Sequence, residues 1–374
     1  MACVRKIGKR WVADYCDAQG KRHREFCRIK REAEDLLAKR LEEIGQGRFN
    51  ADGRKITFAT FAQGWLEAKS ASWAPNTLDI HRNSVHRYLC HADFGLGRYR
   101  VANIDLRAVE GFKAALMEHS PHLSHRTVNL VLTSLGAIMK HAVRHGLRST
   151  NPVEFVDRLP QKRKEITPLT PVQVEALMAN AKALDEQQAA IVQLGLYTGM
   201  RLGEILALRW RDVDLPGMHL SIHGTNSHKS QRARFQDAGS FGNTKTDQSL
   251  RRIKLSATGA QVLREHRMLT GNPAPTALVF ANSKGLPLDP SNFRDRFWNS
   301  LVKAEGLPKG FTFHSLRHTY ASHMLSCGAP VEFVQRQLGH SSYQTTLSVY
   351  RHWIPDRDDL HADIIEAALA SSGQ

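Results

Sequence analysis

Four side chains of the kinds that bind or attack phosphate occur within one 40-residue stretch of this chain. They are His314, Arg317, His340 and Tyr350, in FTFHSLRHTYASHMLSCGAPVEFVQRQLGHSSYQTTLSVY. A guanidinium carries a permanent positive charge, an imidazole exchanges a proton near neutral pH, and a deprotonated phenol is a nucleophile. Groups of these kinds are suited to holding one anion and reacting with it, provided the fold brings them together.

Three short helices are predicted to position them. The first begins at about Ser315 and ends at Gly328, because glycine tolerates the left-handed turn that closes a helix. The second runs from Pro330 to Gly339. A serine at 341 or 342 caps the third, which carries the tyrosine. The four polar side chains therefore lie at helix ends, where chain segments meet.

A second stretch, YTGMRLGEILALRW, adds another arginine. The turn Thr198-Gly199 presents Arg201, and Glu204 lies one helical turn further on, able to hold the guanidinium in place. Each of these residues alone is explained more simply as a helix-surface or core residue. Their combination with the downstream stretch favours a shared anion site.

Together these motifs resemble the tyrosine recombinase (phage integrase) family. The pattern is T-G-x-R-x-x-E, then H-x-L-R-H, L-G-H and a tyrosine ten residues later, and it covers about Ile166 to Pro355. It is specific because it fixes several uncommon residue types in a set order. The segment around the tyrosine, Ser348 to His352, is also similar to the nucleophile region of phage integrases.

The resemblance implies phosphodiester cleavage through two arginines. No carboxylate cluster with metal-ligand spacing occurs, which disfavours a two-metal nuclease and predicts a site without metal or cofactor. Planar guanidinium groups bind phosphate oxygens in a bidentate way and never lose their charge. Arg201 and Arg317 fit that role, and Glu204 supports the first of them.

The resemblance also assigns the remaining roles. Tyr350 is the nucleophile, and bringing its pKa from about 10 to about 7 requires roughly 4 kcal/mol of help. His314 is the expected base, His340 hydrogen-bonds a non-bridging oxygen, and Lys245 donates a proton to the leaving sugar oxygen as general acid. The implied product is a 3′-phosphotyrosyl enzyme with a free 5′-hydroxyl, so the bond energy is kept and no ATP is needed.

Lys245 is assigned on its setting, Asn243-Thr244-Lys245-Thr246, between two alternating segments that predict strands. In the family a lysine on such a hairpin enters the active site. A long polar insert, residues 224–242, precedes it, which departs from the family pattern. The insert is expected to be a surface loop.

Composition favours a nucleic-acid partner. Lys and Arg number 52 against 36 acidic residues, for a formal charge of +16 and a pI near 9.9. The five cysteines form no C-x-x-C pair, which argues against a disulfide framework or a zinc site. No apolar run is long enough to cross a membrane. We expect a cytoplasmic, nucleoid-associated protein.

The order of predicted helices and strands along the chain indicates a mainly α protein with small β elements, built from three domains. Residues 1–50 are predicted to form strands and a helix. The first 31 residues include ten Lys/Arg and three acidic residues, and the segment resembles an arm-site DNA-binding domain. Residues 56–156 are predicted to form a helical bundle, which the resemblance identifies as the core-binding domain. Residues 157–168 are a polar linker. Residues 169–374 are an α+β catalytic domain with a C-terminal helix at about 358–369.

The expected function is a site-specific recombinase or integrase of a phage or mobile element. The resemblance implies a homotetramer on double-stranded attachment sites, strand exchange through a Holliday junction, and possible help from a directionality factor or a DNA-bending host protein. Three alternatives stay open: relaxation of DNA by a type IB topoisomerase, a non-catalytic DNA-binding protein on the same fold, and RNA processing.

Overall fold

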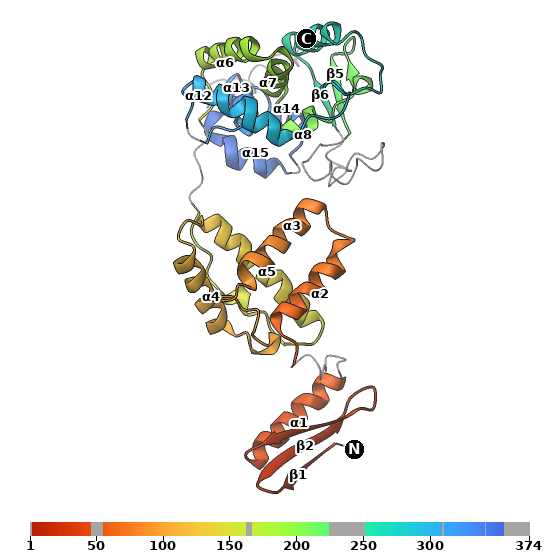
Figure 1. The fold of residues 1–374 in the computed structure, drawn as a ribbon, viewed down its shortest axis with the longest axis vertical. Coiled ribbons are helices and arrows are strands. Elements are labelled where there is room, and N and C mark those ends of the chain that lie inside the picture. Colours follow the sequence, from red (N-terminus) through yellow and green to blue (C-terminus); the bar gives the residue numbers. More distant parts are fainter. Residues whose placement is uncertain are drawn as a thin grey trace, which may run out of the picture. The chain divides into compact units, whose positions relative to one another are not determined.

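The computed structural model divides the chain into two compact units, Met1–Arg163 and Lys164–Gln374, and each is described by itself (Figure 1). The structure describes residues 2–45, 55–161, 167–223, 251–308, 310–340 and 342–354. Lys245, the insert at 224–242, part of the linker and the C-terminal helix at 358–369 lie outside these residues. The predictions made for them therefore stay predictions.

The chain begins with a three-stranded antiparallel sheet and one helix. The strands are β1 (Cys3–Ile7), β2 (Arg10–Cys16) and β3 (Arg22–Cys27) in that order, and the helix is α1 (Lys30–Gly45). The hairpin and the helix were predicted, whereas β1 was not, because its basic sequence has little apolar alternation. β2 is the middle strand, so its residues from Val12 to Tyr15 are buried.

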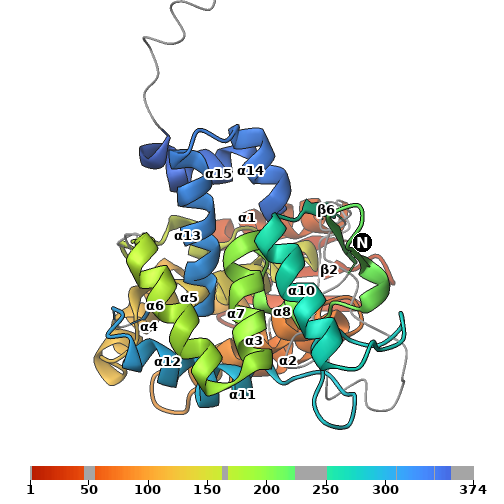
Figure 2. The ribbon, with the colours of Figure 1, turned by 90° about the horizontal axis from the view of Figure 1, so that it is seen from above.

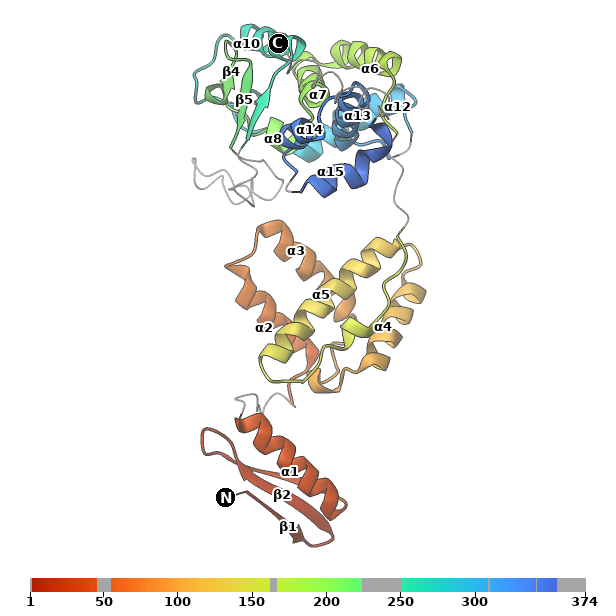
Figure 3. The same ribbon diagram turned by 180° about the vertical axis from the view of Figure 1, so that it is seen from behind.

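A helical bundle follows, and the predicted helices are found there within about two residues at most ends. Its main helices are α2 (Phe58–Ser70), α3 (Pro75–Ser84) continued by the π-helical turn η2 (Val85–Leu89), α4 (Leu106–His119) and α5 (His125–Arg144); η3 (Val101–Asn103) and η4 (Pro152–Phe155) are short 3₁₀ turns. The long helix α5 contacts α2, α3 and α4, as Figure 3 shows. Side chains such as Trp65, Leu89 and Leu132 fill the core between them.

The second unit is built around the buried helix α7. α6 (Pro171–Leu184), α10 (Ala257–Leu269) and α13 (Phe313–Ser326) pack against α7 (Glu186–Thr198), and Figure 2 shows the four helices side by side. A small antiparallel sheet has the order β4 (Val213–Asp214), β5 (His219–Ile222) and β6 (Arg251–Lys254). The other elements are α8 (Leu202–Ile205), η5 (Trp210–Asp212), α11 (Pro290–Asn292), η7 (Phe293–Trp298), α12 (Asn299–Ala304), α14 (Val331–Leu338), α15 (Tyr343–Tyr350) and η8 (Arg351–Trp353).

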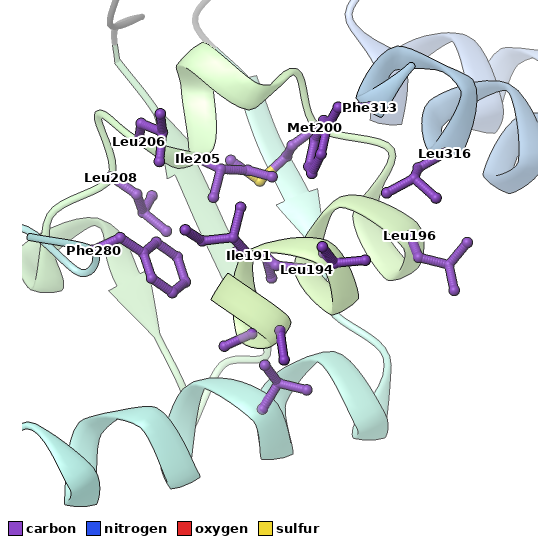
Figure 4. Close-up of a cluster of buried hydrophobic side chains, with 14 of the residues drawn as sticks. Ile191, Leu194, Leu196, Met200, Ile205, Leu206, Leu208, Phe280, Phe313 and Leu316 are labelled. Atoms are coloured by element: carbon purple, nitrogen blue, oxygen red, sulfur yellow. The ribbon is translucent and has the colours of Figure 1, made fainter. Parts of the chain in front are cut away.

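The apolar core of this unit fixes the ends of three helices relative to one another. Ile191 and Leu194 of α7 lie among Ile205 of α8 and Phe313 and Leu316 of α13 (Figure 4). Burying each such side chain contributes about 1.5–3 kcal/mol. Packing of this density leaves the polar residues at those helix ends little freedom to move.

The fold class is the predicted one, mainly α with two small sheets. None of the helices in the described part of the chain is both long and apolar enough to cross a membrane.

Candidate active site

The turn between α7 and α8 is one that only glycine accommodates. Gly199 closes α7 with a φ of +64°, in the left-handed region. A Cβ at this position would lie 2.7 Å from Cδ1 of Tyr320 and 2.8 Å from Cδ2 of Leu338, too close for any side chain. The tight reversal places Arg201 at the N-cap of α8, where the sequence predicted it would be presented.

Glu204 holds Arg201 as predicted, through two hydrogen bonds. Its Oε1 accepts from Nη1 of Arg201 at 2.9 Å, and its Oε2 accepts from the backbone N–H of Arg201 at 3.0 Å. The Glu204 side chain is 6% exposed and that of Arg201 is 43% exposed. The carboxylate therefore fixes one side of the guanidinium and leaves the rest of it accessible to an anion.

Arg251 is a third arginine of the site, and the sequence analysis missed it. Its Nη1 and Nη2 donate to Oε1 and Oε2 of Glu204 at 3.1 and 2.8 Å, and its Nε donates to the carbonyl of Gln337 at 2.9 Å. A signal was present, since residues 251, 253 and 255 share one face of an alternating strand. Ile253 and Leu255 are buried, so the arginine on that face points inward too.

Two arginines keep Glu204 ionised. Burial by itself would raise the pKa of the carboxyl, but the hydrogen bonds and charge of Arg251, with the backbone and charge of Arg201, outweigh it and lower the pKa to about 2. Glu204 is thus a carboxylate throughout the neutral range and neutralises only one of its two partners.

Arg317, on α13, joins two helix ends. It is 1% exposed, and its Nη1 and Nη2 donate to the carbonyls of Gly199 and Leu338 at 2.8 and 2.5 Å. These carbonyls close α7 and α14 and lack helical partners of their own. Burial, together with the charge of Arg201, lowers the pKa of Arg317 to about 9, which still leaves it charged at neutral pH.

Tyr350, the last residue of α15, lies buried with its hydroxyl 2.6 Å from Nδ1 of His318. This contact was not predicted: His318 belongs to the H-x-L-R-H motif, but His314, one helical turn before it, was assigned as the base. Burial raises the pKa of Tyr350 to about 12 although the charge of Arg317 acts against it, so the phenol is neutral here. The hydrogen bond to His318 therefore involves a protonated hydroxyl.

His314 and His340 lie in the same positive surroundings. Burial lowers the pKa of His314 to about 4 and that of His340 to about 3, and the charges of Arg317 and Arg201 add to the effect at both residues. His340 follows the left-handed cap Gly339, and its Nδ1 is 2.9 Å from Oγ1 of Thr346. Both imidazoles are neutral at pH 7, and the same surroundings make them weaker bases than a free imidazole.

The structure thus brings together six of the seven residues predicted for the site; the seventh, Lys245, lies outside the described residues. Two guanidinium groups bind one carboxylate and the third, that of Arg317, is bound by backbone carbonyls, so Arg201, Arg251, Arg317 and Glu204 together carry a net charge of +2. Within the described ranges, no group of three or more His, Cys, Asp or Glu side chains is arranged to hold a metal ion. The arrangement can bind a phosphate beside a phenol nucleophile and neutral bases.

Comparison with known proteins identifies the family. The model of the phage integrase family matches residues 168–356. An integrase from Streptomyces ambofaciens is 30% identical over 362 residues, which is 92% of this chain and 90% of that protein.

Two solved structures share the fold. The Tn1549 transposon integrase, in complex with a circular intermediate DNA, superposes with a TM-score of 0.69 at 21% identity over 83% of this chain and 99% of that one. A lambda integrase tetramer bound to a Holliday junction gives a TM-score of 0.59 at 17% identity over 91% and 95% of the two chains. The predicted family, fold and enzyme class are confirmed, and the chain belongs to the phage integrase family of site-specific tyrosine recombinases.

Proposed function

We propose that this recombinase cuts and rejoins DNA by attack of Tyr350 on one backbone phosphate, which Arg201 and Arg317 hold. The observation that carries the proposal is the convergence of these three side chains in one unit, although they come from segments about 150 residues apart. The attack forms a 3′-phosphotyrosyl bond and releases a 5′-hydroxyl. Attack by a 5′-hydroxyl of a second duplex reverses the step and joins new partners.

The arginines supply the charge that a metal ion supplies in other phosphoryl-transfer enzymes. A five-coordinate phosphorus carries more charge on its oxygens than the ground state, and fixed cations in a water-poor site stabilise it selectively. Arg317 is held by two backbone carbonyls and Arg201 by Glu204, so neither has to reorganise during the reaction. His340 completes the set as donor to a non-bridging oxygen.

The phenol must lose a proton before it attacks. Lowering the pKa of Tyr350 from about 12 to about 7 corresponds to roughly 7 kcal/mol. A neutral histidine is the natural acceptor, and the site contains two near the phenol: His318 touches the hydroxyl, and the His314 ring centroid is 4.9 Å from that of His318. His314 remains the proposed base, and His318 is a second candidate because of its contact.

Lys245 is the proposed general acid for the leaving 5′-oxygen. Its assignment rests on the family pattern around Thr244 and Thr246. An alkoxide leaving group needs a proton at neutral pH, and a lysine in a strongly positive site has a lowered pKa that favours giving one up.

The other domains have proposed DNA-binding roles. Residues 1–50 are the proposed arm-site domain, residues 56–156 the core-binding domain and residues 169–374 the catalytic domain, joined by the linker at 157–168. The DNA-bound forms named for the Tn1549 and lambda integrases support double-stranded attachment sites and a homotetramer for this chain too. We extend this to exchange through a Holliday junction, to association with the nucleoid, and to possible help from a directionality factor or a DNA-bending host protein.

Recombination between two sites tests the proposal. The sites are first mapped by sequencing DNA ends that are covalently attached to the protein in cells expressing it. A supercoiled plasmid carrying two mapped sites should then yield recombinant circles with the natural protein and none with Tyr350→Phe. Relaxed plasmid without recombinants would instead favour the topoisomerase alternative, and unchanged plasmid would favour a non-catalytic DNA-binding protein.

A further inference from the structure

Arg251 connects three chain segments that each carry or adjoin a residue of the proposed site. It begins β6, its two Nη atoms bind the carboxylate that holds Arg201, and its Nε binds the carbonyl of Gln337 at the end of α14. Two residues beyond that carbonyl, Gly339 turns the chain into His340. One guanidinium thus links the segment that presents Arg201 to the segment that presents His340.

Arg251 is enclosed by protein atoms, and its hydrogen-bond donors are bound to them. Its side chain is 7% exposed, and its Nε, Nη1 and Nη2 all donate hydrogen bonds to protein oxygens. Its guanidinium and Cδ lie against Gly339: a Cβ there would come within 2.9 Å of Arg251 Cδ and Nη1. The arginine therefore fills the space that the glycine leaves open, directly before His340.

Arg251 also compensates the charge of Glu204 and orients its carboxylate toward Arg201. A buried carboxylate with only one half-exposed cationic partner is poorly compensated, because water screens that partner. Arg251 provides a second, buried partner in bidentate geometry, which fixes the orientation of both carboxylate oxygens. The same two oxygens bind Arg201, so a change in the orientation of Arg251 also changes the orientation of Arg201, the proposed phosphate-binding arginine.

We propose that Arg251 is a positioning residue for strand cleavage, which aligns Arg201 and His340 around the scissile phosphate by way of Glu204 and the end of α14. The inference rests on the proposed function. A purely structural arginine would lower the amount of folded enzyme, whereas a positioning arginine lowers the rate at which folded, DNA-bound enzyme reacts.

The test measures single-turnover cleavage of a nicked DNA duplex that carries one mapped site, with enzyme in excess. The amplitude reports the fraction of active enzyme and the rate constant reports the chemistry, while DNA affinity and melting temperature are measured separately. The variants are Arg251→Met, which removes the guanidinium group, and Arg251→Lys, which keeps the positive charge without the bidentate geometry. The matched control is Arg252→Met, since Arg252 is the next residue on the strand and its side chain is 65% exposed.

We expect the rate constant to fall about 10- to 100-fold for Arg251→Met, to be intermediate for Arg251→Lys, and to stay close to the natural value for Arg252→Met, with DNA affinity within a few-fold throughout. An unchanged rate constant in Arg251→Met, or a reduced amplitude with an unchanged rate constant, would overturn the proposal. Failure of both Arg251 variants to fold would overturn it as well. The natural protein is run alongside: if it forms no covalent product, the proposed function itself has failed.

Discussion

Two carboxylates in different units of this protein each gather arginines, and they do so in opposite ways. Asp14, 1% exposed in the middle strand of the N-terminal sheet, is paired with Arg5, Arg22 and Arg24, whose side chains are 44–55% exposed. Glu204, 6% exposed, is paired with Arg201, 43% exposed, and with Arg251, 7% exposed. Both carboxyl groups have a pKa lowered to about 2.

The difference lies in what holds the arginines. In the sheet, Asp14 is the shared ion-pair partner of three half-exposed arginines that water screens, so it sets their spacing loosely. In the second unit, Arg251 and Arg317 are also bound to backbone carbonyls of α14 and α7, which are themselves fixed by the core. A screened cluster suits long-range attraction of DNA, whereas a fixed cluster suits chemistry at one phosphorus. Substitutions should therefore have large effects on cleavage and stability in the second unit and small ones in the N-terminal sheet.

The largest effect is expected at Arg317. Arg317→Met should slow single-turnover cleavage by at least about 10²–10³-fold, because it removes a preorganised cation and leaves two helix-end carbonyls without their donor. The measurement is formation of the covalent complex on a site-bearing duplex. Arg264→Met, an exposed arginine on α10, is the matched control and should cleave normally. Equal rates for the two variants would show that the buried cation is not needed.

The largest change in the free energy of unfolding is expected for substitution of Glu204. Glu204→Gln leaves Arg251 buried without its anion, which should lower the free energy of unfolding by about 3–5 kcal/mol at pH 7. The folded pKa of about 2 lies below the ordinary 4.5, so the carboxylate stabilises the native state fully above pH 4.5 and progressively less as the pH falls toward 2. Denaturant unfolding at several pH values should show the gap between variant and natural protein narrowing in that window; a constant gap would contradict the ion-pair account.

The two histidines beside the tyrosine can be separated by their rates. His314→Gln should reduce the cleavage rate constant about 10²-fold or more if His314 is the base. His318→Gln should have the smaller effect, since it removes a hydrogen bond to the hydroxyl but leaves the proton acceptor. Single-turnover rates across pH 6–9 check this. The reverse order would transfer the role of base to His318, the residue in contact with the Tyr350 hydroxyl.

The smallest effect on chemistry is expected at Asp14. Asp14→Asn should leave single-turnover cleavage of a short duplex unchanged and lower the melting temperature less than Glu204→Gln does, because the three arginines around it are half exposed. Affinity for longer DNA should become more salt-dependent, since one anion is removed from a basic surface. A cleavage defect as large as that of Arg317→Met would erase the contrast between the two clusters.

Much of this arrangement could be predicted from the sequence, and what was missed has identifiable physical reasons. Capping residues predicted the bounds of α13 and α14 and the start of α15 within about two residues, because capping is local chemistry. Arg201 and Glu204 were paired correctly because they lie one turn apart. Arg251 binds a residue 47 positions earlier, and His318 one 32 positions later, and no local rule specifies such contacts.

The most direct test of the central claim is to identify the amino acid that becomes attached to DNA. The protein is trapped on a nicked duplex carrying one mapped site, digested with protease and nuclease, and the modified peptide is sequenced by mass spectrometry. The account predicts a single 3′-phosphonucleotide adduct on the tyrosine of the peptide that contains Ser348 and Tyr350. An adduct on Tyr320 or Tyr343, or on a serine, would contradict it.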